Sequence, residues 1–437
     1  NMHNARRART PMINVVGDHA TYHLQHDAPL TSDIEGLAWP MSHFVRRIES
    51  PEDVGPAIGE AYAASLSLPG VTTVILPADC AWGSVEPATL APTKVPTLKS
   101  ADPARVREIA ALLRKHGSRA ALMMTGLALR EGPMVMAARI CAATGARVFG
   151  QMSNGRIERG AGRVALPKVP YPIDMALKQL ENVDLLVLVG AQVPVGFFAY
   201  PGKPGRLIHD GCAVETLAAP GDDLPGAIEA LADELSARAV APAFIAEPAA
   251  ANGALPTGAL DADKVCTIVS TLLPENSIIC DESISSGRMF YAQCHHAPQH
   301  DYIQLTGGAI GEGIPLAIGA AVACPDRKVI GMQADGSGMY TVQGLWTQAR
   351  ENLDVVTVIF ANRTYAILHG EMRAVGVNDF GKNATQMLNL DQPALDWVAM
   401  AKSMGVEAGR ATTAEEFTRL FKGALSRKGP FLIEAVI

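Results

Sequence analysis

The strongest constraint on the fold is a pair of apolar runs separated by one helix length. Residues 327–333 and 355–360 are rich in Val, Ile, Met and Phe, which is typical of buried strands, and residues 338–350 between them predict a helix. Two parallel strands need a crossover connection of this length. The sequence therefore predicts a strand–helix–strand unit in an open α/β sheet.

Polar residues follow both runs. Asp335 comes after the first and Asn362 after the second, and open α/β sheets bind ligands at the carboxyl ends of adjacent strands. Gly336 and Gly338 let backbone amides approach a phosphate, and Ser337 adds a hydroxyl at the helix start. Oxygen ligands completed by phosphate oxygens suit Mg²⁺, so the unit predicts a magnesium–phosphate site.

The spacing of 27 residues between positions 335 and 362 resembles the thiamine diphosphate motif of the 2-oxo-acid decarboxylase and acetolactate synthase superfamily. In that family a Gly-Asp-Gly signature is followed just under thirty residues later by an Asn. Ala334 replaces the first glycine here, which we expect to be tolerated if its backbone keeps a negative φ. The competing interpretation is an Asp and an Asn that only cap turns.

Two stretches rich in proline and alanine, residues 85–103 and 241–260, read as linkers. With the resemblance they predict an α/β protein of three doubly wound parallel-sheet domains. These are a pyrimidine-binding domain (1–90), a Rossmann-like central domain (104–240) and a diphosphate-binding domain (262–437). The family's first domain has another sixty to ninety residues before this point, so the resemblance implies that residues 1–90 are a truncated part of it.

Local patterns place further elements in each segment. The predicted strands are 12–16, 71–77, 119–125, 183–189, 206–209, 277–280 and 431–436, and the predicted helices are 51–67, 132–144 and 224–238.

The resemblance also assigns cofactor-binding residues. A glycine-rich stretch, 305–318, corresponds to the loop that bends thiamine diphosphate, with the carbonyl of Gly308 receiving the 4′-amino group and Ile310 wedged between the rings. Ser285 and Ser286, in a turn that looks most like benzoylformate decarboxylase, are candidates for phosphate contacts, with helix capping as the alternative.

After Asn362, the backbone carbonyl of Thr364 is expected to complete the metal shell. Ile367 is expected beside the cofactor, and Leu368 and Glu371 in the substrate pocket. Acetolactate synthases usually have a tryptophan near the last of these positions, so Glu371 argues against the acetolactate reaction itself.

Catalytic groups are less well defined by the sequence. His19 follows the strand at 12–16 and is the candidate proton donor or orienting residue, whereas a polar loop residue without catalytic duty fits equally well. In the family a glutamate of the first domain activates the cofactor, and its position lies upstream of residue 1. Glu60 imitates that glutamate's helix but matches a later helix of the family.

The composition is that of an ordinary soluble α/β protein. The net charge of −7 gives no case for nucleic acid or an anionic membrane, and no apolar run reaches membrane-spanning length. Seven scattered cysteines favour a reducing cytoplasm. No Gly-x-Gly-x-x-Gly fingerprint supports FAD or a nicotinamide dehydrogenase.

The resulting hypothesis is a thiamine-diphosphate- and Mg²⁺-dependent enzyme that decarboxylates a 2-oxo acid, with release of an aldehyde or joining to a second carbonyl. The resemblance implies a homodimer or homotetramer. The alternative is a non-catalytic cofactor-binding subunit or remnant of the same family.

Overall fold

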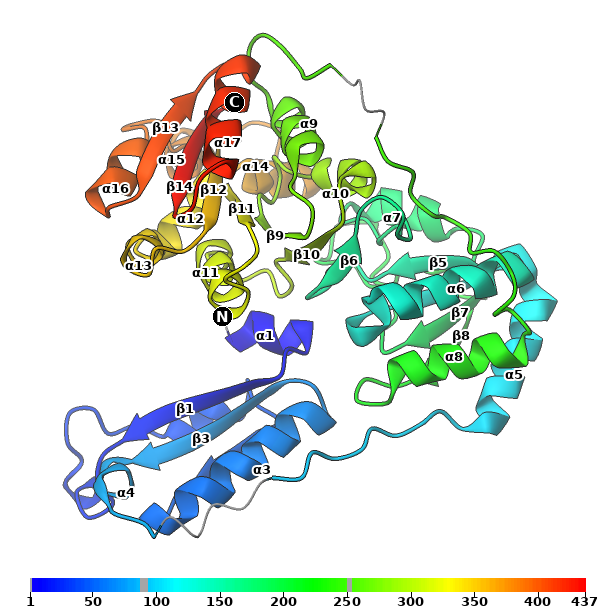
Figure 1. Ribbon diagram of the computed structural model, residues 1–437, viewed down its shortest axis with the longest axis horizontal. Helices are drawn as coiled ribbons and strands as arrows, with labels where there is room; N and C mark the ends of the chain where they lie inside the picture. Colours follow the sequence, from blue (N-terminus) through cyan, green and yellow to red (C-terminus); the bar gives the residue numbers. More distant parts are fainter. Residues whose placement is uncertain (1, 87–92, 250–253) are drawn as a thin grey trace.

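Three sheets, all flanked by helices, make up the protein. The computed structural model describes residues 2–86, 93–249 and 254–437 (Figure 1). Each of the three segments expected from the sequence contains parallel strands of one sheet, three in the first, four in the second and six in the third. The α/β class and the parallel sheets are therefore confirmed.

The first segment forms a parallel sheet in the order β1-β3-β2. Its predicted strands and helix are present, and Ala57 and Ala61 of the long helix pack against Val74 of the central strand. The elements are α1 (Met2–Ala8), β1 (Met12–Asp18), η1 (Leu24–His26), α2 (Ile34–Ala38), β2 (Phe44–Arg47), η2 (Pro51–Asp53), α3 (Val54–Ser67), β3 (Val71–Pro77) and α4 (Ala78–Trp82).

The central segment forms a parallel sheet in the order β5-β4-β7-β8. Its elements are α5 (Pro103–His116), η4 (Gly117–Arg119), β4 (Ala120–Met124), η5 (Gly126–Leu129), α6 (Glu131–Thr144), β5 (Arg147–Gly150), β6 (Ile157–Arg159), α7 (Ile173–Leu180), β7 (Leu185–Val189), β8 (Ala213–Ala218) and α8 (Leu224–Glu234).

The strand predicted at 206–209 is wrong. The amide of Leu207 donates to Pro194 O and that of Gly196 to Gly205 O, so this stretch pairs with the loop before it. The place beside β7 is taken by β8 instead.

The third segment supplies six parallel strands of a seven-stranded sheet in the order β13-β14-β12-β11-β9-β10-β6. Its elements are α9 (Ala262–Leu272), β9 (Ser277–Glu282), α10 (Phe290–Gln293), η6 (Cys294–His296), β10 (His300–Gln304), α11 (Gly313–Ala323), β11 (Val329–Ala334), α12 (Asp335–Gly338), η7 (Met339–Thr341), α13 (Gly344–Arg350), β12 (Val355–Ala361), α14 (Ala366–Ala374), α15 (Lys382–Leu388), α16 (Trp397–Ser403), β13 (Glu407–Ala411), α17 (Ala414–Leu425) and β14 (Phe431–Val436). The single helix predicted at 338–350 is three short pieces that begin at Asp335.

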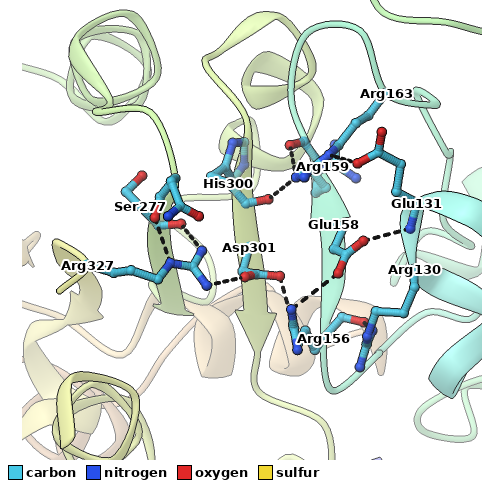
Figure 2. A network of polar contacts seen from close by, with 11 residues as sticks. Arg130, Glu131, Arg156, Glu158, Arg159, Arg163, Ser277, His300, Asp301 and Arg327 are labelled. Atoms are coloured by element: carbon cyan, nitrogen blue, oxygen red, sulfur yellow. Dashed lines mark hydrogen bonds and ion pairs between the residues drawn. The ribbon is translucent and has the colours of Figure 1, made fainter. Parts of the chain in front are cut away.

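The seventh strand, β6, comes from the central segment and pairs antiparallel with β10. Figure 2 shows the charged network around this pair. Asp301 on β10 accepts from Arg156 and Arg327, both at 2.7 Å. The shared strand and this network attach the central segment to the third sheet.

The linkers are only partly described. Pro87 and Pro92 lie outside the described residues, and residues 93–98 and 254–257 contain neither helix nor strand.

In the described ranges, no helix combines the length and the apolar character needed to span a bilayer.

Candidate active site

Asp335 lies at the carboxyl edge of the large sheet, directly after β11. Strands β11 and β12 are adjacent, with Ala334 opposite Phe360, so the ends that precede Asp335 and Asn362 lie side by side. The Asp335 carboxylate accepts the amides of Gly336 (2.9 Å) and Arg363 (2.7 Å). Burial raises its pKa to about 6. A buried carboxylate that is held by backbone amides, and to which no basic side chain of the described residues is bonded, suits a cation.

Asn362 links this carboxyl edge to the serine turn. Its Nδ2 donates to Ser286 Oγ at 3.2 Å, and its Oδ1 accepts the amide of Thr364 at 3.0 Å. Ser285 is the half-buried neighbour of Ser286 in the same turn. The structure thus brings the predicted metal and phosphate residues together from three different loops.

Two non-glycine residues beside this cluster have left-handed backbone conformations. Ile284, just before the serines, has φ 49°, and Arg363, just after Asn362, has φ 55°. Such a conformation costs on the order of 1–3 kcal/mol, and is common where function requires it. For a β-branched residue such as Ile284 it is especially unusual.

The signature glycines are explained by packing. A Cβ on Gly336 would lie 2.4 Å from the Tyr365 ring, and one on Gly338 would lie 2.7 Å from Trp397. Ala334 has φ −74°, the negative value that its side chain requires. Ser337 Oγ accepts from Gln333 Nε2 at 2.6 Å.

Glu282 is a residue that the sequence interpretation missed. It ends β9, is 1% exposed, and accepts the amides of Gly311 and Gly313, both at 2.5 Å. Gln333 Nε2, which also reaches Ser337, donates to it at 3.2 Å. Glu282 therefore joins the glycine-rich turn to the loop after β11. An acidic residue at the end of an apolar strand was the only signal in the sequence.

The glycine-rich turn also carries Gly308 and Ile310. Gly308 has φ 78°, and a Cβ there would lie 2.6 Å from the Phe197 ring of the central segment. Glycine is therefore required at this position by both conformation and contact. Ile310 is half-buried.

Helix α14 follows Tyr365 and carries Ile367, Leu368 and Glu371. Ile367 is half-buried and Leu368 is exposed. The Glu371 carboxylate accepts hydroxyl bonds from Tyr171 and Tyr200 of the central segment. The sequence interpretation did not include these two tyrosines.

His19 does not join this cluster within one chain. It follows β1 and lines a cavity of about 960 Å³ together with residues such as Asp18 and Trp82. Figure 1 shows the carboxyl end of β1 pointing away from the third segment. The Nε2 atom of His19 is buried without a hydrogen-bond partner among the described residues.

Glu60, the glutamate that imitates the family's activating residue, lies on α3 and forms an ion pair with Arg46.

Glu312, beside the glycine-rich turn, introduces a pH dependence. Burial, with Glu282 nearby, raises its pKa from 4.5 to about 7, and Asn4 Nδ2 donates to it at 2.5 Å. The folded state thus binds this proton more tightly than the unfolded chain, so the stability it provides is complete at low pH and is lost as pH rises through about 7.

We expect Glu312→Gln, which imitates the protonated acid, to raise the free energy of unfolding by roughly 1–3 kcal/mol at about pH 8, because one pKa unit corresponds to ~1.4 kcal/mol. Near pH 5 the change should be small. Urea unfolding at both pH values measures this difference. An equal shift at the two pH values would contradict the assignment to ionisation.

The residues present fit a magnesium–diphosphate group. Across the described residues there is no cluster of three or more His, Cys, Asp or Glu side chains arranged to hold a metal ion. Asp335 provides one carboxylate and Asn362 one amide oxygen, so phosphate oxygens are needed to complete an oxygen shell. This donor set suits Mg²⁺ better than a softer metal.

Comparison with known proteins agrees with this class of site. Residues 284–435 match the model of the thiamine pyrophosphate enzyme C-terminal TPP binding domain. The chain is 46% identical over 438 residues to a Mycobacterium tuberculosis protein named as an acetolactate synthase large subunit, IlvX, covering 100% of this chain and 83% of that protein. It is 33% identical over 281 residues to the benzoylformate decarboxylase of Pseudomonas aeruginosa, covering 61% of this chain and 51% of that enzyme.

The fold resembles the thiamine diphosphate-dependent 4-hydroxybenzoylformate decarboxylase of Rhodococcus jostii RHA1, with a TM-score of 0.82, 24% identity and coverage of 99% and 83% of the two chains. The fold is that of an α/β protein, and residues 284–435 match a TPP binding domain. The chain belongs to the thiamine-pyrophosphate-dependent enzyme family.

Proposed function

We propose that this protein is a thiamine-diphosphate- and Mg²⁺-dependent enzyme that decarboxylates a 2-oxo acid, releasing an aldehyde or passing the fragment to a second carbonyl. The observation that carries the proposal is the buried Asp335 carboxylate beside Asn362 and Ser286 at one sheet edge.

In this proposal Asp335, Asn362 and the carbonyl of Thr364 hold Mg²⁺, and the turn containing Ser285 and Ser286 contacts the diphosphate. Bound thiamine diphosphate supplies a nucleophilic carbon and an electron sink for the carbanion left by CO₂. The chain's own contribution is binding and orientation.

The remaining predicted residues shape the surroundings of the cofactor. Gly308 and Ile310 are proposed to hold its bent conformation. Glu282 keeps their turn in place through two backbone amides. Ile367 and Leu368 are proposed to present apolar surface, which excludes water from the reacting group.

The position of His19 supports a shared site. Within one chain, the carboxyl end of β1, which His19 follows, points away from the third segment (Figure 1). We therefore infer a homodimer or homotetramer in which the first segment of one subunit meets the third segment of another. The scattered cysteines are the reason to propose that it is cytoplasmic.

A screen of 2-oxo acids tests the function. We expect the protein, expressed from its whole gene, to release CO₂ from at least one of pyruvate, a branched 2-oxo acid or benzoylformate. Release should require both thiamine diphosphate and Mg²⁺, because the site lacks enough protein ligands to hold either alone. Coupled detection of CO₂, with and without an aldehyde acceptor, separates decarboxylation from carboligation. Cofactor binding without any CO₂ release would instead favour a non-catalytic subunit.

A further inference from the structure

Glu371 is bound by the central segment in an unusual way. Tyr171 donates its hydroxyl to Oε1 at 2.8 Å, and Tyr200 donates to Oε2 at 2.6 Å. Burial and the contact with Glu371 raise the pKa of both phenols, so both remain protonated donors. Within the parts of the chain that the structure describes, Glu371 has no ion-pair partner. The carboxylate is therefore oriented by two neutral donors, and no basic side chain of the described residues is paired with it.

An aromatic surface extends from this carboxylate to the glycine-rich turn. The Phe197 ring lies 5.4 Å from Tyr171 and 4.9 Å from Phe198, measured between ring centroids. Phe197 also contacts Gly308 at the position where a Cβ would be. We call Tyr171, Phe197 and Phe198 the aromatic shelf. Phe197 and Phe198 are 42% and 51% exposed, so their faces are accessible.

The chemistry of this arrangement restricts what can bind between the turn and α14. A carboxylate offers about four acceptor positions, of which the two tyrosines use two. A flat ring can pack against the aromatic shelf. The carboxylate of a 2-oxo acid is repelled by the Glu371 charge, so it must point the other way. A donor at the far end of the substrate then meets Glu371.

We propose that Glu371, oriented by Tyr171 and Tyr200, selects 2-oxo acids whose aromatic side chain carries a hydrogen-bond donor at the end remote from the oxo acid. This inference rests on the proposed function and specifies its substrate class. Glu371 is a specificity-determining residue, and the two tyrosines are positioning residues.

Three matched substrates test the proposal with the cofactor-loaded protein: benzoylformate, 4-hydroxybenzoylformate and 4-methoxybenzoylformate. We expect kcat/KM for the hydroxyl compound to exceed that for each of the others by at least about tenfold, as for one hydrogen bond to a charged acceptor. The methoxy compound matters because it adds bulk and an acceptor at the same position but has no donor. Equal values for all three compounds would overturn the proposal.

Variants identify the residue responsible. Glu371→Gln should reduce the preference to less than about threefold through a higher KM for the hydroxyl compound with little change in kcat. Tyr171→Phe and Tyr200→Phe should each reduce it partially, whereas Glu275→Gln and Tyr62→Phe, both at exposed positions, should leave it unchanged. A full preference in Glu371→Gln would contradict the assignment.

A binding measurement makes the proposal independent of turnover. Mandelate and 4-hydroxymandelate have a hydroxyl in place of the oxo group and do not decarboxylate by this route. Calorimetry with the cofactor-loaded protein should show tighter binding of 4-hydroxymandelate by at least about tenfold, lost in Glu371→Gln. No difference between the two ligands, or no binding of either, overturns the proposal. Failure to release CO₂ from any 2-oxo acid would overturn the proposed function instead, while the mandelate pair still decides the role of Glu371.

Discussion

Replacing Asp335 with alanine is expected to abolish tight binding of thiamine diphosphate and Mg²⁺. The substitution removes both a metal ligand and its negative charge, and Glu282, at the end of the neighbouring β9, is already bonded to the amides of Gly311 and Gly313. We expect the dissociation constant of the cofactor, measured by calorimetry in the presence of Mg²⁺, to rise at least about 100-fold, or ~2.7 kcal/mol. Activity should fall to background.

Two controls separate this loss from misfolding. Asp335→Asn keeps one oxygen, enough for the amide of either Gly336 or Arg363, and has no charge, so it should disturb the fold less than alanine does and still lose at least about tenfold in affinity. Asp326→Ala, at an exposed position, should bind as the wild type does. If Asp335→Ala bound the cofactor and Mg²⁺ normally, the metal assignment would be wrong.

Replacing Glu282 with alanine is expected to have the second largest effect, on both stability and cofactor affinity. Three donors, the amides of Gly311 and Gly313 and Gln333 Nε2, lose a buried acceptor. Each unsatisfied buried donor costs ~1–3 kcal/mol. Burial also raises the pKa of Glu282, so removal of the acid offsets part of this cost. We expect the free energy of unfolding to fall by about 2–5 kcal/mol.

Because the glycine-rich turn loses its anchor, the cofactor's affinity should also fall at least about tenfold. Urea unfolding and calorimetry measure the two effects separately. Glu275→Ala, an exposed glutamate on the loop before β9, should change stability by no more than ~0.5 kcal/mol. Wild-type affinity in a folded Glu282→Ala protein would show that the turn does not depend on this contact.

Elements defined by local pattern were predicted well. The strands before Asp335 and Asn362, the final strand and the helix at 51–67 follow from apolar periodicity within single segments, and all are present. The prediction at 206–209 failed because an apolar stretch next to glycines and prolines can pair with its own loop as readily as with a sheet. The single helix predicted at 338–350 is divided into three short helical pieces, because the sequence pattern did not indicate the breaks between them.

The sequence by itself determined the α/β class and the adjacency of Asp335 and Asn362, because neighbouring strands and the residues that end them are encoded locally. The tertiary structure alone decided that β6 joins the third sheet, that Glu282 bonds the glycine-rich turn, and that Tyr171 and Tyr200 reach Glu371. Tyr171 is 200 residues from Glu371 in the sequence and Tyr200 is 171 residues from it, so no local pattern indicates either contact. A tyrosine or glutamate in a loop has many possible partners, and only the packing of the segments selects one.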